Sequence, residues 1–206
     1  MKFIMDPLVY LLIALLPSAV LAQSSNVGVG NAAQVQQGSV GSTQGIDLGN
    51  VKGQAKSSVN ANQIVQTQSG THNQQSLSAG DASGTAQSNV AAGALVQSQS
   101  GTLNKQSMNI GNATGSGKSN VSIGSAVQVQ SGALNNQQLN VGNSAGGGNA
   151  NVKAGKIVQV QGGVMNNAAV NIGNVSGQGT SNVSVGDVIQ TQTGTGQSGN
   201  VRIGNK

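Results

Sequence analysis

The sequence predicts an all-β protein: a β-solenoid in which six repeats of about 31 residues stack in register, in a cross-β arrangement. A valine recurs every 31 residues, or 32 at the first step, and such a period is typical of stacked repeat arrays. Apolar residues fall at fixed offsets in every copy. Residues 23–206 contain no Phe, Tyr, Trp, Pro or Cys, so one unit lacks the aromatic area or disulfides to fold alone. Each unit could form a simple coil or a Greek-key layer, and the pattern leaves both open.

The first 22 residues predict a secretory signal peptide. They contain Lys2 near the start, an apolar run over 8–16, and Ala22 at the expected cleavage point. The apolar run is shorter than the ~20 residues that cross a bilayer, so we expect a secreted protein that is not embedded in a membrane. The repeat domain then covers 23–206, with repeats starting near residues 25, 57, 88, 119, 150 and 181.

Two segments of each unit predict short strands with one buried face. The recurring valine is followed two positions later by a second apolar residue, as in Val121 and Ile123, with a variable residue between them. A later segment repeats this spacing with a polar residue at its centre, as in 139–141. The predicted core positions are Val27, Val59, Val90, Val121, Val152, Val183, Leu139, Val141, Val170 and Ile172.

A third strand is predicted between these two, and it carries glutamine at two positions in all six copies. In 126–130, for example, a period of two places Gln128 and Gln130 on the same side as Ala126. A buried amide is costly unless it is paired, but identical glutamines stacked at ~4.8 Å can hydrogen-bond along the stack. The alternative is that these glutamines point outward for solubility. The predicted ladder comprises Gln34, Gln36, Gln66, Gln68, Gln97, Gln99, Gln128, Gln130, Gln159, Gln161, Gln190 and Gln192.

Glycines predict the turns of each unit. One glycine follows the second glutamine by two residues and suits a turn that needs positive φ or a close backbone approach. Another closes the strand over 139–141, and a Gly/Ser/Ala-rich connector then leads into the next copy. The turn glycines of the first kind are Gly38, Gly70, Gly101, Gly132, Gly163 and Gly194.

Four successive units share a motif that resembles the Q-x-G-x-x-N core of curlin repeats. It spans 68–73, 99–104, 130–135 and 161–166. Segments 89–93 and 120–124 are also similar to parts of Fap-type amyloid subunits. This resemblance implies a bacterial functional amyloid subunit that polymerises outside the cell into fibres of a biofilm matrix. It also implies nucleator, chaperone and outer-membrane export partners.

Catalytic chemistry is not predicted. The whole chain has one histidine and no cysteine, and Asp47, Asp81 and Asp187 fall at three different repeat offsets. No convergent acid, base or metal-ligand set results, so we expect no enzyme, cofactor or metal. The net charge of +5 is dispersed, and residues 23–206 have no aromatic ring on which a base could stack, so nucleic acid is not an expected partner.

Self-assembly is the function that the repeats favour. An uncapped solenoid end exposes strand edges that can template another chain, and end-to-end stacking of layers would give a fibre. The alternative is a monomeric secreted solenoid that binds a surface or ice, as an adhesin or ice-binding protein. Thr67, Ser98 and Thr191 at one offset favour this alternative, but the other copies have valine there, namely Val35, Val129 and Val160.

Overall fold

The protein is described by a computed structural model that covers residues 24–35, 40–53, 56–84, 87–115, 117–146, 149–173, 175–176 and 179–204. The predicted signal peptide, Gln36 and Gly38 lie outside the described residues. All regular elements in the described ranges are β-strands, and they form three parallel sheets. The all-β solenoid predicted from the repeats is confirmed.

Each unit supplies a long strand, then a strand of five residues and a strand of two residues. The long strands are β1 (Ser24–Val35), β4 (Lys56–Thr67), β7 (Gln87–Ser98), β10 (Lys118–Val129), β13 (Asn149–Val160) and β16 (Thr180–Thr191). The five-residue strands are β2 (Gln44–Leu48), β5 (Gln75–Ala79), β8 (Gln106–Ile110), β11 (Gln137–Val141), β14 (Ala168–Ile172) and β17 (Gly199–Ile203). The two-residue strands are β3 (Val51–Lys52), β6 (Ala82–Ser83), β9 (Ala113–Thr114), β12 (Ser144–Ala145) and β15 (Val175–Ser176).

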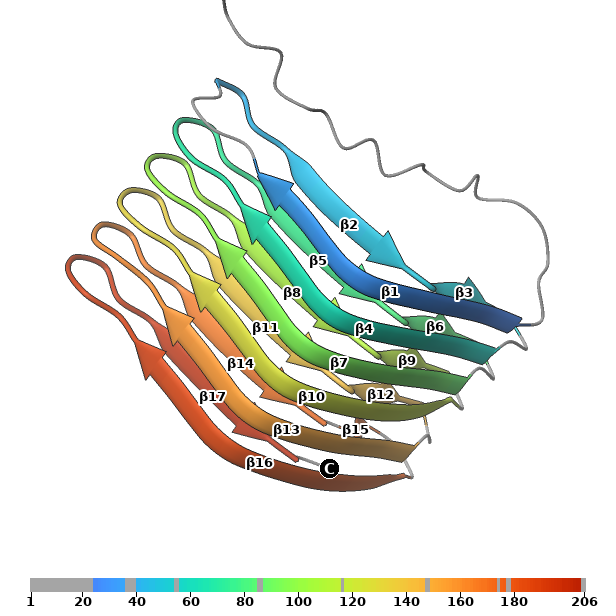
Figure 1. Cartoon of the computed structure of the whole chain (residues 1–206). Coiled ribbons are helices and arrows are strands. Elements are labelled where there is room, and N and C mark those ends of the chain that lie inside the picture. Colours follow the sequence, from blue (N-terminus) through green and yellow to red (C-terminus); the bar gives the residue numbers. More distant parts are fainter. Residues whose placement is uncertain are drawn as a thin grey trace, which may run out of the picture.

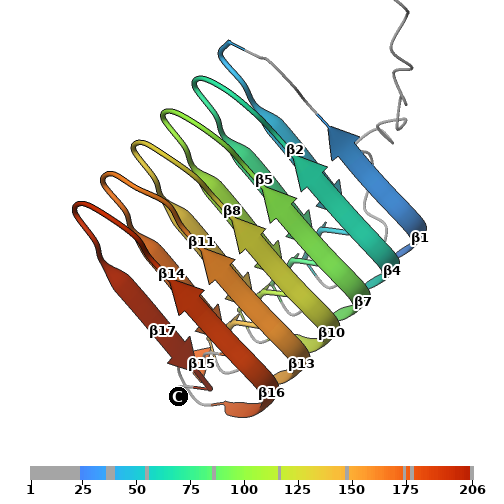
Figure 2. The same cartoon turned by 60° about the vertical axis from the view of Figure 1, so that its left-hand side comes forward.

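Every strand pairs in parallel with its equivalents in the neighbouring units (Figures 1 and 2). The long strands form one sheet in chain order, and the shorter strands form two more. One unit therefore makes one turn of the coil. The first step is 32 residues between β1 and β4 but 31 between β2 and β5, so the additional residue lies between Val35 and Gln44. Within the described residues the two-residue strands number five, and the sixth unit ends at β17.

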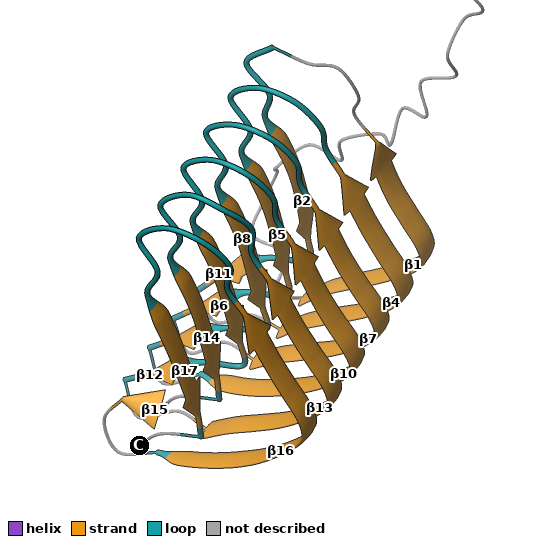
Figure 3. Ribbon diagram, turned by 90° about the vertical axis from the view of Figure 1, so that its left-hand side faces the viewer, coloured by secondary structure: helices purple, strands orange, loops and turns teal. Residues whose placement is uncertain are grey.

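The strand boundaries correct two predictions. The two short strands expected in the first half of each unit are one continuous strand that bends near its middle (Figures 1 and 3). At the bend Gly124 and Ser125 both face outward. The alternation of inward and outward side chains is therefore shifted by one residue after the bend, so that Ala126 faces inward. A Cβ on Gly124 would collide with the carbonyl oxygen of Gly93 in the coil below. The Gly/Ser/Ala connector, expected to be a loop, contributes the two-residue strands.

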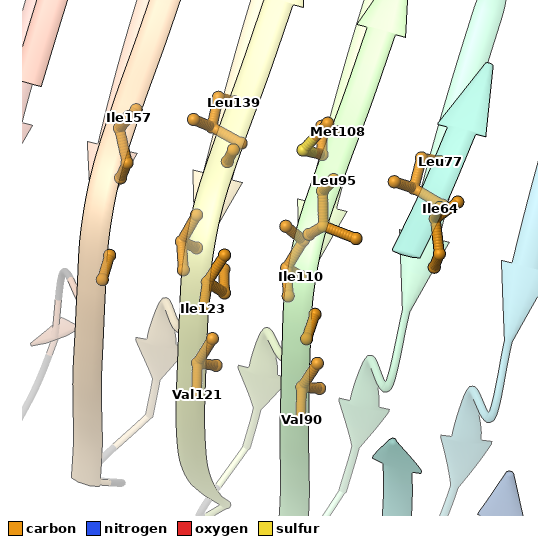
Figure 4. Close-up of a cluster of buried hydrophobic side chains, with 14 of the residues drawn as sticks. Ile64, Leu77, Val90, Leu95, Met108, Ile110, Val121, Ile123, Leu139 and Ile157 are labelled. Carbon is orange, nitrogen blue, oxygen red and sulfur yellow. The ribbon is translucent and has the colours of Figure 1, made fainter. Parts of the chain in front are cut away.

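The core lies between the long strands and the five-residue strands, and it continues from coil to coil (Figure 4). Leu95 and Met108 face each other across one coil, with exposed fractions of 1% and 0%. Of the ten predicted core positions, eight are buried. Val27 and Val183, in the first and last coils, are only partly buried. A side chain at these positions is therefore buried where a coil covers it on both sides, and only partly buried in the first and last coils, which have a neighbour on one side.

A glycine that closes each five-residue strand holds the corner of the coil. Gly111 has φ of +60°, a conformation that L side chains rarely adopt, and a Cβ there would collide with Val121. The carbonyl of Gly111 accepts a hydrogen bond from the Ser119 hydroxyl. The positive φ and the close approach to a valine recur at Gly49, Gly80, Gly142 and Gly173, and the serine bond recurs at all of these except Gly142, where Ala150 replaces the serine. The corner thus depends on a residue that is glycine in every copy.

Candidate functional site

The first glutamine of the first five units forms the predicted ladder. The ladder does not reach Gln190, because neither the Oε1 of Gln159 nor the Nε2 of Gln190 has a hydrogen-bond partner within the described residues. Its members in the second to fifth units are fully buried. Each side-chain Nε2 donates to the Oε1 of the equivalent glutamine in the preceding coil. These bonds are Gln66 to Gln34 at 3.1 Å, Gln97 to Gln66 at 2.7 Å, Gln128 to Gln97 at 2.8 Å and Gln159 to Gln128 at 2.9 Å.

The same amides also hold the two walls of each coil together. The Nε2 of Gln97 donates to the backbone carbonyl of Ser107 on the facing strand, at 3.0 Å. Gln66, Gln128 and Gln159 make the equivalent bond at 2.8 to 3.0 Å. An amide nitrogen has two hydrogens, so one bond runs along the stack and the other crosses the coil. Two partners in different directions fix the orientation of each buried amide.

The second glutamine column does not form the continuous ladder that was predicted. Gln68, Gln99 and Gln130 are 1 to 2% exposed, yet neither amide atom of any of them has a hydrogen-bond partner within the described residues. One ladder bond exists in this column, from Gln192 to Gln161 at 3.3 Å. These glutamines lie just beyond the ends of the long strands, where the nearby turn carbonyls of Ser100 and Ser131 accept bonds from asparagines instead.

The asparagine of the Q-x-G-x-x-N motif forms a second complete amide ladder, which was not among the predicted site residues. Nδ2 of Asn104 donates to Oδ1 of Asn73 at 3.1 Å, and Asn135 and Asn166 continue the series at 2.9 and 3.0 Å. All four residues are buried. Each also donates to a backbone carbonyl in its own turn. The presence of asparagine at one offset in four successive units was the signal for this ladder.

A third glutamine column, at the first residue of the five-residue strands, was also missed. Gln75, Gln106 and Gln137 are buried, and each Nε2 lies 3.4 Å from the Oε1 of the ladder glutamine across the coil. Gln44 occupies the same offset in the first coil. Amides from both walls therefore meet inside the coil.

The turn glycines fit the prediction in only part of the chain. Gly70 and Gly194 have positive φ, of 62° and 82°. In the three units between them positive φ falls on the next residue, namely Thr102, Ala133 and Val164. The prediction of positive φ or a close backbone approach therefore does not hold at Gly101, Gly132 and Gly163, where φ is not positive and an added Cβ would meet no atom within 4 Å. The asparagine accounts for part of the shift: Asn73 binds the carbonyl three residues before it, whereas Asn104 binds the carbonyl four residues before it.

The outer face of the long-strand sheet carries amides and hydroxyls. Asn89, Asn120, Asn151 and Asn182 form an exposed ladder with bonds of 2.8 to 3.0 Å. A shallow groove beside it is lined by Ala91, Ser122, Lys153 and Ser184. Within the described ranges, no group of three His, Cys, Asp or Glu side chains could hold a metal ion, and no helix could span a membrane.

The two ends of the stack differ from its interior. Among the described strands, β1 and β2 pair on one edge only, as do β16 and β17. Val201 and Ile203 in the last coil are 45% and 44% exposed, whereas the equivalent Val170 and Ile172 in the preceding coil are 0% exposed. The end layers thus expose backbone hydrogen-bonding groups and part of the apolar core together. No protein-family model, no curated protein and no solved structure matches this chain.

Proposed function

We propose that this chain is a secreted structural subunit that self-assembles by end-to-end stacking of its β-solenoid layers into extracellular functional amyloid fibres of a biofilm matrix. One observation carries the proposal: the last coil presents the strand edges and core positions that each interior coil uses to bind its neighbour. A further chain stacked in register would cover Val201 and Ile203 as Val170 and Ile172 are covered. The surface that joins coils would then also join chains.

The amide ladders support the proposal because they extend by repetition. Each new coil adds the same hydrogen bonds along the stack, such as Gln97 to Gln66 and Asn104 to Asn73. Because each Nε2 donates to the preceding coil, the Oε1 of Gln190 is the acceptor that the last coil presents to an added chain. An added coil with glutamine at this offset, as Gln34 provides, would donate its Nε2 to that Oε1.

Secretion and the helper proteins complete the proposal. The signal-peptide pattern of the first 22 residues supports a location outside the cytoplasm. The curlin and Fap resemblance adds a nucleator, a chaperone and an outer-membrane export system as partners. The fibre itself is a homopolymer.

The test is seeded growth of the chain from Gln23, which contains every described residue. Purified protein incubated with sonicated seeds should give unbranched fibres in electron micrographs, with diffraction spacings near ~4.8 Å along the axis and ~10 Å across it. Protein that stays monomeric through prolonged incubation with seeds would reject the proposal.

Two matched variants test whether the end layer is the growing surface. Ile203 and Ile189 are both in the last coil, at 44% and 43% exposure. Only Ile203 follows residues that are fully buried in the four interior coils, namely Ala79, Ile110, Val141 and Ile172. Ile203→Lys should stop elongation because it places a charge in the layer-to-layer core, whereas Ile189→Lys should elongate almost normally. Equal elongation of the two variants would argue against growth through this end.

Ice binding is the weaker alternative. The column that contains Thr67, Ser98 and Thr191 is interrupted by three valines, so the outer face presents no continuous row of hydroxyls there. Thermal hysteresis without fibre formation would reverse this order of preference.

A further inference from the structure

The two ends of one surface column carry opposite charges. On the sheet of five-residue strands, equivalent outward positions are aligned from coil to coil by the strand register. They are Asp47, Ser78, Asn109, Asn140, Asn171 and Arg202. Asp47 and Arg202 are both exposed. Among the described columns, this one alone has a charged residue at each end.

Side chains in this column reach their neighbours one coil away. Nδ2 of Asn140 donates to Oδ1 of Asn109 at 2.9 Å, and Nδ2 of Asn171 donates to Oδ1 of Asn140 at 3.1 Å. The longer side chain of arginine can therefore meet a carboxylate in the next coil. A coil stacked on β17 in register would place its residue of this column beside Arg202.

We propose that a second copy of this chain binds head to tail, its first coil (β1 and β2) on the last coil (β16 and β17), with Arg202 paired to Asp47 of the second copy. This inference rests on the proposed fibre function and adds the polarity and register of the junction. The same register places Val27 of the second copy beyond Val183, and Leu48 beyond Ile203. It also brings Asn31 of the second copy to Asp187, where an amide can donate to a carboxylate.

The charges favour this polarity over the alternatives. Two first coils facing each other would have no Arg202 at the junction, and two last coils would have no Asp47 there, so neither arrangement can form this pair. Head-to-tail stacking in register alone brings the two opposite charges of the column together, and opposite charges guide that encounter. An exposed pair adds little affinity, so its main effect is on register and on the rate of addition.

A charge-exchange experiment tests the junction. Arg202→Glu and Asp47→Lys each place like charges at every junction. At low salt, each variant grown on seeds made from that same variant should elongate roughly three- to thirtyfold more slowly than wild-type protein on wild-type seeds. The double variant restores opposite charges and should elongate within about twofold of wild type, because only the order of the two charges is exchanged.

A mixture of the two single variants tests the same pairing without the double variant. In an equimolar mixture of Arg202→Glu and Asp47→Lys chains, alternating junctions pair Glu with Lys or Arg with Asp. The mixture should therefore grow faster than either variant alone, and high salt should reduce the difference. Lys105→Glu serves as the control, since Lys105 lies in an exposed turn within the stack and changes net charge without touching the junction.

The outcomes separate the two proposals. If wild-type fibres form but neither single variant slows and the mixture shows no rescue, the head-to-tail register is wrong and the fibre function remains. If wild-type protein forms no fibres with seeds, the proposed function itself is rejected, and the junction with it.

Discussion

The two glutamine columns at the ends of the long strands are alike in sequence but differ in bonding. Gln97 and Gln99 are two residues apart, both are glutamine in every unit, and both are almost fully buried. Gln97 bonds along the stack and across the coil, whereas both amide atoms of Gln99 lack a partner within the described residues. Stacking identical amides is therefore not sufficient for a ladder.

The difference lies in the bond that crosses the coil. The carbonyl of Ser107 stands opposite Gln97 and accepts one of its two hydrogens, whereas Gln99 makes no crossing bond. In the column of Gln99, Gln161 and Gln192 do cross the coil, to the carbonyls of Asn167 and Ser198, and the column's one ladder bond joins these two glutamines. A crossing bond fixes the amide so that its second hydrogen and its oxygen point along the stack. The ladder thus needs a backbone acceptor as well as a repeat.

The largest expected effect comes from removing the bonded amide. Gln97→Met keeps an unbranched side chain of similar length but leaves Ser107 and the amides of Gln66 and Gln128 short of a partner. Because unpaired buried polar groups cost about 1–3 kcal/mol each, we expect a loss of about 2–4 kcal/mol in the free energy of unfolding. Urea denaturation of fresh monomer at low concentration measures it. A loss below about 1 kcal/mol would show that the ladder bonds are energetically minor.

The matched substitution in the other column should have a smaller effect of opposite sign. Gln99→Met removes two buried atoms that have no partner, so the free energy of unfolding should stay unchanged or rise by up to about 2 kcal/mol. The same urea series on the same preparation gives the difference between the two variants. If both variants lose stability equally, Gln99 is hydrogen-bonded in solution and the contrast between the columns disappears.

The smallest expected effect comes from a column that mixes amide and carboxylate. This column consists of Asn50, Asp81, Asn112 and Asn143. The side-chain oxygens of Asn50, Asp81 and Asn112 each accept a hydrogen bond from the backbone N–H of the next residue in the column. Burial raises the pKa of the Asp81 carboxyl above its usual range, although hydrogen bonds from Ser78 and Asn112 oppose the shift. The folded chain therefore binds the Asp81 proton more tightly than the unfolded chain does. Stability from this group rises as pH falls through the folded pKa and levels off below the unfolded pKa.

Asp81→Asn should remove that pH dependence. The amide can keep the acceptor bond from Asn112 and can donate to Ser78, as Asn50 does at 2.8 Å. We expect the variant to be more stable than wild type near pH 7, by less than about 1 kcal/mol, and equal to it in acid. Urea midpoints at the two pH values measure this. If the wild-type chain instead loses stability relative to the variant on acidification, the raised pKa of Asp81 is contradicted.

The fold was predictable to the extent that it depends on the repeat. The 31-residue period gives the coil length and register, and the aliphatic offsets give the buried face of each strand. The slip in alternation at Gly124 and Ser125 made one bent strand resemble two. The short strand at Ser144–Ala145 has little strand propensity of its own, because its pairing comes from the coils above and below.

The candidate site was predictable only in part. Residue identity was enough to find the ladder of Gln97, because its backbone partner follows from the coil itself. It was not enough to separate Gln99 from Gln97, since only Gln97 makes a bond across the coil. The positive φ at Thr102 belongs to the same turn and also has no signal in residue type. Bonding across the coil is a property of three-dimensional placement that spacing along the chain does not report.

The two larger sheets each have six strands in chain order. Along a fibre of the proposed kind, both sheets would continue from chain to chain with the spacing that separates coils within a chain. Each chain then occupies about 29 Å of the axis, six layers at ~4.8 Å. The boundary between two molecules would be one layer spacing among many.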